Sequence, residues 1–383
     1  MGIDALDWEI LNQLIKEEEV PHFEMIKRRG VSAKINLNEP NEKGSAVFWT
    51  SIATGQLSDK HGIDYFVTQS PDQGKRIPYT SNMRKTKAFW NILSENDISV
   101  GIVGWYLTWP AERIKGFMVS SYYALKDTQQ PTWKGTIYEG GDHMVYPPKI
   151  QAKVDGYIQE AKSKCLENIK NIIKPEGLEI GYGYIEETKW AFLTDQIYHE
   201  IGINLYKEIE PQVFAVYFEG VDVVGHRFTF PKKAMQKHMN HRFGNVQRNY
   251  YLYMDRIIRS YIEEVDENTL FIVAADHGLM RGHHTNNGVF MIFGPGIKKN
   301  TWSPEPMDLT DIVPTILYAL GLPIAKDMDG EPHLDIFTHE FLENNKVKYI
   351  RTYGKRKDIS ESPMETQFDE EILRRLKSLG YIK

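Results

Sequence analysis

The sequence has almost no cysteine and no long apolar run. Its 383 residues include one cysteine, Cys165, which has no partner for an internal disulfide. The same scarcity excludes a zinc site built from several thiolates, so a metal would need His, Asp or Glu ligands. No apolar stretch reaches the ~18 residues that a membrane-spanning helix needs, and no signal peptide is visible. These absences suit a reducing compartment, and we expect a cytoplasmic protein without a membrane span.

Clustered positive charge is also lacking. The formal net charge is −6, and the basic residues are spread along the chain without a stripe or tail. Binding to a nucleic-acid duplex is therefore not expected. A chain of this charge that handles a phosphate would need local positive charge, which metal ions could supply. The sequence leaves the oligomeric state open.

The alternation of apolar and helical patterns predicts an α/β fold. Apolar runs rich in β-branched and aromatic residues predict buried strands at 98–104, 213–218, 269–275 and 288–293. Helical patterns occur at 5–19, 46–53, 148–173, 186–209 and 308–320. We expect Pro21 to end the first helix, Gly55 to close the second, and Gly321 to cap the last. Pro314 within the last pattern predicts a kink or a later start. The alternation predicts a doubly wound, mostly parallel sheet with helices on both faces.

Changes in amino-acid composition along the chain predict how it is organised. Residues 1–105 and 211–345 are expected to form the core. Residues 106–210, rich in Tyr, Trp, Pro and Lys, are expected to be an insertion that forms a cap over the site. The alternative is that the helices of this insertion simply cover the sheet. Residues 346–383 are expected to be a tail that packs on the core.

Acidic or imidazole side chains appear immediately after each of three apolar runs. Asp4 follows Gly2-Ile3, and Asp222 and His226 follow the run that ends at 218. After the run that ends at 275 come Asp276, His277, His283 and His284. Because ligands of a doubly wound sheet bind beyond the carboxyl ends of its strands, we expect these groups to converge. A spacing of four places the first Asp/His pair on one helical face. Carboxylate oxygens and neutral imidazoles suit Zn²⁺ and similar ions, and the number of candidates favours two metals over one.

Each of these pieces is weak when it stands alone. An isolated D-x-x-x-H is more often structural, and other histidines have simpler explanations. His238 and His241 lie in a polar, basic segment and are expected to be solvated, and His61 is expected to be a turn residue. The conjunction at three strand ends is what points to a metal site.

A nucleophile is available in the stretch GSAVFWTSIATG at 44–55. Ser45 would lie at a helix N-terminus, whose free backbone N–H groups favour a phosphate or sulfate. A metal on its oxygen would lower the pKa of the hydroxyl. The alternative is that Ser45 only caps the helix, which the local sequence by itself favours.

Several ordered motifs together resemble a known family. These are Gly2-Ile3-Asp4, SAVFWTSIATGQLSDKHGI, EGVDVVGH, AADHG and GHHTNNGVFMIFGPGI, followed by DIVPTILYALGLPIAKDMDGEP and the terminal LRRLKSLGYIK. They resemble the type I phosphodiesterase/nucleotide pyrophosphatase family of the alkaline phosphatase superfamily, from the first residues to the last.

The resemblance implies an alkaline phosphatase-like fold with two divalent metals, usually zinc, with manganese as the other candidate. One metal would be held by Asp222, His226 and His284. The other would be held by Asp4, Asp276 and His277, with the oxygen of the nucleophile Ser45 beside it. The same resemblance reverses the preference for Ser45 as a mere cap, and leaves Thr50 and Ser51 as weaker candidates for the nucleophile.

Two departures from the family pattern stand out. The family usually has threonine, any residue, proline where this chain has Ser45-Ala46-Val47, although serine can do the same chemistry. Only Met1-Gly2-Ile3 precede Asp4, where relatives have a full strand. A truncated chain or a misassigned start would explain this, and we expect Asp4 to be held loosely.

The implied activity is hydrolysis of a small phosphodiester or of a nucleotide pyrophosphate bond through a covalent intermediate on Ser45. A phosphomonoesterase and a phosphomutase are alternatives from the same superfamily. A sulfatase would need C/S-x-P-S-R, which SAVFWTS does not match, and a non-catalytic binding protein remains as the non-enzyme alternative. Four aromatic residues of the insertion could stack on a base or merely pack, and we favour packing: Trp105, Trp109, Tyr122 and Tyr123.

Overall fold

A single mixed sheet of ten strands organises the described part of the chain. The structure, a computed structural model, describes residues 1–70, 74–124, 141–178, 183–230, 232–357, 359, 364–366, 368–378 and 381–382. The strands lie in the order β13 (Thr301–Trp302), β2 (Val31–Asn36), β12 (Gly288–Phe293), β9 (Phe271–Ala274), β1 (Gly2–Ile3), β8 (Val213–Phe218), β5 (Val100–Val103), β6 (Gly116–Val119) and β7 (Val145–Tyr146), with β14 (Met307–Asp308) beside β2. Strands β9, β1, β8, β5 and β6 run parallel to one another, whereas β12 and β7 are antiparallel to their neighbours. The predicted strands at 98–104, 213–218, 269–275 and 288–293 are all present in this sheet.

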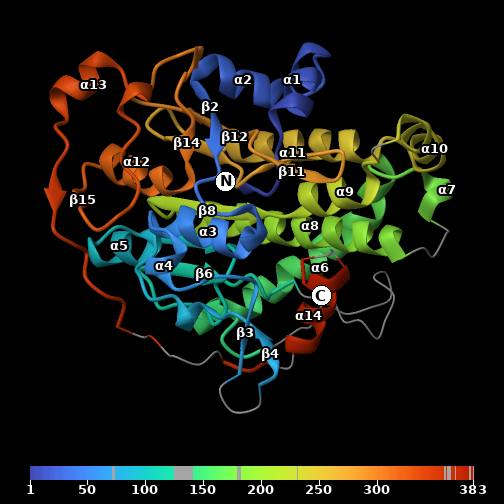
Figure 1. The fold of residues 1–383 in the computed structure, drawn as a ribbon, viewed down its shortest axis with the longest axis horizontal. Coiled ribbons are helices and arrows are strands. Elements are labelled where there is room, and N and C mark those ends of the chain that lie inside the picture. Colours follow the sequence, from blue (N-terminus) through green and yellow to red (C-terminus); the bar gives the residue numbers. More distant parts are fainter. Residues whose placement is uncertain are drawn as a thin grey trace.

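Helices cover both faces of this sheet (Figure 1). One face packs against α1 (Trp8–Lys16), α2 (Pro21–Arg29), α6 (Gln151–Asn168), α8 (Gly183–Ile209), α9 (Gly220–Phe228) and α11 (Val246–Ile262). The other face packs against α3 (Ser45–Thr54), α5 (Phe89–Glu95) and α12 (Ile312–Ala319). Strand β8 shows why both faces are apolar, since Val216 and Phe218 face the first set and Ala215 and Tyr217 the second.

Shorter elements surround this core. The small helices are α4 (Ser58–His61), α7 (Pro175–Leu178), α10 (Lys233–Phe243), α13 (His339–Asn344) and α14 (Asp369–Ser378). Three two-stranded sheets pair β3 (Val67–Gln69) with β4 (Arg76–Pro78), β10 (Gly278–Met280) with β11 (His283–Thr285), and β15 (Ile324–Ala325) with β16 (Tyr349–Ile350). Among the described helices, none combines the length and the hydropathy that crossing a membrane requires.

The first strand is short but central. Gly2 pairs with Tyr217 of β8 on one side and with Ala274 of β9 on the other. The backbone N–H of Asp4 donates to the Phe218 carbonyl oxygen at 2.9 Å, which continues this ladder. The expected loosening of Asp4 is therefore wrong, because backbone pairing to β8 and β9 fixes the residues around it.

One predicted helix differs from the observed one, and another starts late as expected. The pattern at 5–19 forms a helix only over Trp8–Lys16, and Pro21 starts α2 instead of ending α1. Proline suits the first turn of a helix because its missing N–H would be unpaired there in any case. The later start expected from Pro314 is observed, since a 3₁₀ turn at Leu309–Asp311 precedes α12.

The 106–210 segment is built into the sheet as well as over it. Its strands β6 and β7 extend the sheet beyond β5, and α8 packs against β8 and β5. The division into a core and a cap, and the separate tail at 346–383, stay predictions.

Gly44 fixes the start of α3, and we predict that Gly44→Ala destabilises the protein. Its φ is +77°, and an added Cβ would lie 2.2 Å from Phe66. The strained backbone and the clash should lower the free energy of unfolding by roughly 2–4 kcal/mol, measured by urea denaturation. Gly156→Ala is the control, because an added Cβ in α6 meets nothing within 4 Å and should be neutral or stabilising. Equal losses in both variants would contradict this account.

Candidate active site

Three adjacent parallel strands bring the predicted residues to one edge of the sheet. Strand β1 lies between β8 and β9, and Asp4 and Asp276-His277 follow β1 and β9 directly. Beyond β8 the chain enters α9, whose first two turns carry Asp222 and His226 on the same face. The Asp222 Oδ1 and His226 Nε2 atoms are 3.2 Å apart. Convergence follows because the carboxyl ends of parallel neighbours share one edge.

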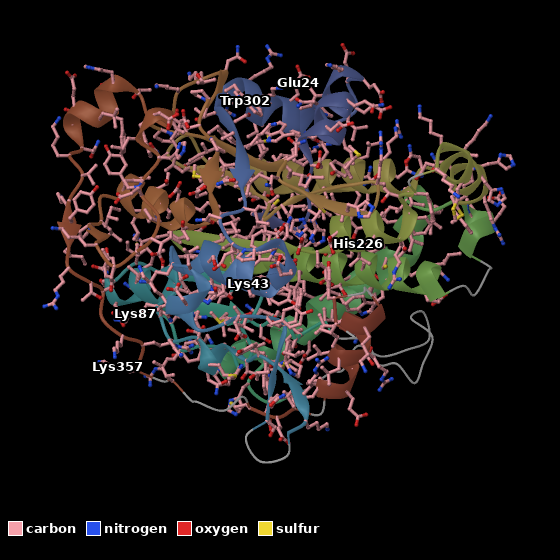
Figure 2. All side chains as sticks on the ribbon, in the orientation of Figure 1. Glu24, Lys43, Lys87, His226, Trp302 and Lys357 are labelled. Atoms are coloured by element: carbon pink, nitrogen blue, oxygen red, sulfur yellow. The ribbon has the colours of Figure 1, made fainter. Side chains whose placement is uncertain are left out.

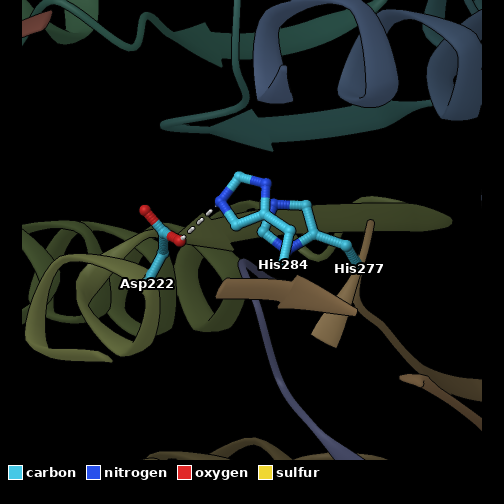
Figure 3. A group of neighbouring side chains, drawn as sticks. All are labelled: Asp222, His277 and His284. Carbon is cyan, nitrogen blue, oxygen red and sulfur yellow. Dashed lines mark ion pairs between the residues drawn. The ribbon is translucent and has the colours of Figure 1, made fainter. Parts of the chain in front are cut away.

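His284 reaches this edge through the β10–β11 hairpin. His284 is opposite Leu279 in the hairpin, while the neighbouring His283 is exposed. Since successive side chains of a strand point to opposite faces, only one of the two histidines can face the aspartates. The His284 ring stacks on His277 with centroids 3.9 Å apart, and its Nε2 lies 3.8 Å from Asp222 Oδ1 (Figure 3).

The donor atoms form two overlapping groups. Asp4, Asp276 and His277 make one group, as the resemblance implied, and Asp222, His277 and His284 make the other. His277 Nε2 is 3.5 Å from Asp4 Oδ1 and 3.4 Å from Asp276 Oδ2. His226 adjoins the second group, with its Nε2 only 3.0 Å from His284 Nε2. In Figure 2, His226 lies toward the middle of the molecule, whereas Glu24 and Lys357 lie near its rim.

Each of the three aspartates is held through one oxygen, and its other oxygen faces a histidine nitrogen at 3.2–3.5 Å without a hydrogen-bond partner. Asp4 Oδ2 accepts from the Tyr217 hydroxyl at 2.6 Å and from Trp49 Nε1 at 3.2 Å. Asp276 Oδ1 accepts from the backbone N–H groups of His277 and Ala5 at 3.0 and 3.3 Å. Asp222 Oδ2 accepts from the Tyr381 hydroxyl.

The unpartnered atoms gather where a cation would be held. The buried atoms without a hydrogen-bond partner include Asp4 Oδ1, Ser45 Oγ, Asp222 Oδ1, Asp276 Oδ2 and His277 Nε2. Leaving one such buried polar group unsatisfied costs about 1–3 kcal/mol, so five in one site need an explanation. The oxygen and imidazole donors suit divalent cations, and a bound cation would satisfy them.

The close packing of charged groups shifts the pKa values of the clustered aspartates and histidines. Burial, and then the nearby Asp222 charge, raise the pKa of Asp4, and burial with the Asp4 charge raises that of Asp276 well above its usual range. Burial also acts to raise the pKa of Asp222. The nearby His226 and the other imidazoles outweigh burial, so the pKa of Asp222 is lowered. In turn Asp222 raises the pKa of His226 against the effect of burial. Burial and His277 lower the pKa of His284 to about 3, so this ring is neutral.

Ser45 does not cap the helix that it begins. The N-cap of α3 is Gly44, and Ser45 is the first helical residue with an unpartnered, buried Oγ. The rival hydroxyls are engaged, because Thr50 Oγ1 donates to the Ala46 carbonyl at 2.7 Å and Ser51 Oγ lies 3.1 Å from His61 Nε2. Ser45 also lines the pocket that contains Asp4 and Asp222.

His61 is a correction to the sequence prediction. It is predicted to be a turn residue, and it is the last residue of the four-residue helix α4, where its side chain is fully buried. Its Nδ1 accepts from the Ile63 N–H at 3.2 Å, which leaves Nε2 to donate to Ser51. This imidazole therefore cannot accept a proton from Ser51. The other two predictions are confirmed, since His238 and His241 are exposed.

An aromatic pocket opens beside these groups. Its described lining includes Phe66, Tyr79, Tyr106, Tyr122, Tyr198, Tyr217 and Tyr381, together with Ser45, Asp4, Asp222 and Glu219. None of the lining residues that the structure describes is a lysine or an arginine. Of the four aromatic residues singled out in the sequence, only Tyr122 lines the pocket, where it stacks on Trp109 at 5.4 Å. Trp105 packs against Trp49, and the Tyr123 hydroxyl hydrogen-bonds with Asp155, so packing explains most of them.

Sequence reasoning missed the residues that hold the ligands. Trp49 and Tyr217 lie in a predicted helix and strand, but no local pattern shows that they reach Asp4. Asp195 of α8 is buried and accepts from the N–H groups of Glu219 and Gly220, which fixes the start of α9. Such contacts join segments far apart in the chain and have no signature in a single sequence.

Comparisons with known proteins bear on the fold and the family of the chain. GPI ethanolamine phosphate transferase 3, catalytic subunit, of Mus musculus is 28% identical over 136 residues, covering 33% of this chain and 11% of that protein. Arylsulfatase K of Canis lupus familiaris is 27% identical over 95 residues, covering 22% of this chain and 18% of that protein. The matches thus span less than a fifth of the length of these relatives. Wild-type alkaline phosphatase PafA superposes with a TM-score of 0.57 at 13% identity, covering 88% of this chain and 98% of that one.

The structural likeness confirms the predicted fold, a mostly parallel sheet with helices on both faces of the alkaline phosphatase kind. The type I phosphodiesterase/nucleotide pyrophosphatase model matches residues 1–292, well over half of the sequence. The chain therefore belongs to the type I phosphodiesterase/nucleotide pyrophosphatase family.

Proposed function

We propose that the chain is a metal-dependent hydrolase of small phosphodiesters, including nucleotide pyrophosphate bonds, with Ser45 as its nucleophile. The observation that carries this proposal is the cluster of buried donor atoms without hydrogen-bond partners, together with the Ser45 hydroxyl, which also has none and lines the same pocket as Asp4 and Asp222. Two divalent ions, zinc or manganese, are proposed to be held by Asp222, His226 and His284 and by Asp4, Asp276 and His277. When bound, such ions lower the pKa of a hydroxyl and neutralise the charge that develops on a phosphoryl group.

The proposed reaction has two displacements at phosphorus. In the first, Ser45 Oγ loses its proton and bonds to phosphorus while the bond from phosphorus to the leaving alcohol or nucleotide oxygen breaks, and the leaving group takes up a proton. In the second, a water oxygen bonds to the phosphorus of the covalent intermediate, the bond from phosphorus to Ser45 Oγ breaks, and a proton from the water restores the Ser45 hydroxyl. The start of α3 favours a phosphate beside Ser45, because the helix dipole and its free N–H groups attract anions.

The composition of the pocket favours a diester over a monoester. A diester carries one negative charge near neutral pH, whereas a monoester carries nearly two. Among the described residues that line the pocket there is no cationic side chain, and Glu219 adds negative charge to it. Its aromatic walls suit a planar or apolar leaving group such as a nucleoside. A panel of bis-p-nitrophenyl phosphate, p-nitrophenyl phosphate and p-nitrophenyl sulfate tests this choice against the monoesterase and sulfatase alternatives. A phosphomutase would release no free phosphate or nucleotide.

Ser45→Ala should abolish turnover without loss of metal. Removing a nucleophile typically lowers kcat by roughly 10³- to 10⁶-fold, which is measurable with bis-p-nitrophenyl phosphate. Thr50→Val is the matched control, because that hydroxyl only bonds to the Ala46 carbonyl within the same helix. Metal content by mass spectrometry must equal that of the wild type. Wild-type turnover by a metal-loaded Ser45→Ala protein would exclude Ser45 as the nucleophile.

Asp276→Asn should separate stability from metal binding. The neutral amide keeps the oxygen that accepts from His277 and Ala5 but removes the charge that burial and Asp4 disfavour. Without metal, the variant should gain roughly 1–3 kcal/mol of unfolding free energy at pH 7.5. With zinc, the wild type should show a large rise in Tm and the variant little. A variant that loses stability in chelator and still gains the wild-type zinc shift would refute the proposed ligand role.

Acid should weaken metal binding through His226. Its pKa is raised by Asp222 in the metal-free protein, and a ligand imidazole must be neutral, so protons compete with the metal as pH falls through that raised value. The zinc dissociation constant should increase about tenfold per pH unit below it, measured by chelator competition from pH 8.5 to 5.5. His238→Asn, an exposed histidine, should leave this profile unchanged. A flat profile for the wild type would argue against histidine ligands.

A further inference from the structure

Tyr381 makes a contact with Asp222 that the reaction described above does not use. We propose that Tyr381 is a positioning residue, whose hydroxyl turns the Asp222 carboxylate so that its free oxygen faces the histidines of the metal site. This inference rests on the proposed function, because it assumes that Asp222 is a metal ligand.

The C-terminal segment reaches the pocket through a small amphipathic helix. Phe368, Ile372 and Leu376 are spaced four apart and are all buried, so they form one apolar stripe on and just before α14. Helix α14 packs against β4, and Figure 1 shows it beside the sheet that β3 and β4 form. Ile372, Leu376 and Tyr381 line the same pocket as Ser45 and Asp222. The segment is thus a wall of the candidate active site.

Several contacts fix the position of the Tyr381 ring. The ring stacks on Phe66 with centroids 4.8 Å apart and an interplanar angle of 10°. The Tyr381 carbonyl oxygen accepts from the Tyr65 hydroxyl, and its N–H donates to the Leu376 carbonyl at 2.9 Å. With the backbone and the ring both held, the hydroxyl has little freedom and donates to Asp222 Oδ2.

This contact completes a pattern that the other two aspartates already show. Tyr217 and Trp49 engage one oxygen of Asp4, and backbone N–H groups engage one oxygen of Asp276, so that a single unpartnered oxygen remains on each. Tyr381 is the side chain that does the same for Asp222, whose Oδ1 is left 3.2 Å from His226 Nε2. Outer hydrogen bonds of this kind orient metal ligands, and their loss typically lowers metal affinity by about 10- to 100-fold.

The test compares Tyr381→Phe with wild type in the full chain. The variant keeps the ring that stacks on Phe66 and loses only the hydroxyl. Its zinc affinity, from chelator competition, should fall by about 10- to 100-fold, while the Tm in excess chelator stays close to wild type. Saturating zinc should restore most of kcat, and the absorption bands of the cobalt-substituted protein should shift as the carboxylate reorients.

Two further variants sharpen the interpretation. Tyr65→Phe frees the Tyr381 backbone but keeps its hydroxyl, so the loss of zinc affinity should be smaller and in the same direction. Tyr353→Phe is the control, because its hydroxyl donates to the Pro323 carbonyl at 2.5 Å, outside the pocket. Zinc affinity and cobalt bands of Tyr381→Phe that match wild type would overturn the inference and leave the proposed function intact. A wild-type chain that binds no zinc or manganese would instead overturn the proposed function.

Discussion

The structure depends on a cluster of three buried carboxylates around the imidazole of His277. Asp4, Asp222 and Asp276 each have one oxygen fixed by protein donors and one oxygen without a hydrogen-bond partner, and His277 Nε2 also lacks such a partner. Such an arrangement is costly in the absence of a cation, because burial and mutual repulsion raise the pKa of Asp4 and Asp276. A fold retains such a cost where function requires it, and here the required element is positive charge.

The sheet makes this crowding possible. Strands β8, β1 and β9 are neighbours and run parallel, so residues that are hundreds of positions apart in sequence meet at their carboxyl ends. Helix α9 and the β10–β11 hairpin then add imidazoles from above the same edge. Strand β1 needs only two residues for this purpose, since pairing on both sides fixes Asp4. Helix α3 starts at the same edge and brings the Ser45 hydroxyl into the pocket.

The pocket divides its tasks between the sheet edge and the surrounding walls. The edge supplies the charged donors, whereas the walls are largely aromatic, and no cationic side chain is present among their described residues. One wall comes from the 106–210 segment through Tyr106 and Tyr122, and another from the C-terminal segment through Ile372 and Tyr381. Under the proposed function, phosphoryl transfer and the choice of leaving group would reside in different parts of the chain, and such a division lets one fold serve several substrates.

The sequence by itself determined the strands, the convergence of Asp4, Asp222, Asp276 and the histidines, and the family, because periodicity and abrupt polar ends to apolar runs are local signals. It misjudged His61 and the boundary between α1 and α2, where burial and a helix-starting Pro21 override local reading. Only the tertiary structure decided which oxygen of each aspartate is free and that Tyr217, Trp49 and Tyr381 select it. Those contacts join residues 45 to 213 positions apart, and side-chain orientation across such separations arises from packing, which no local pattern encodes.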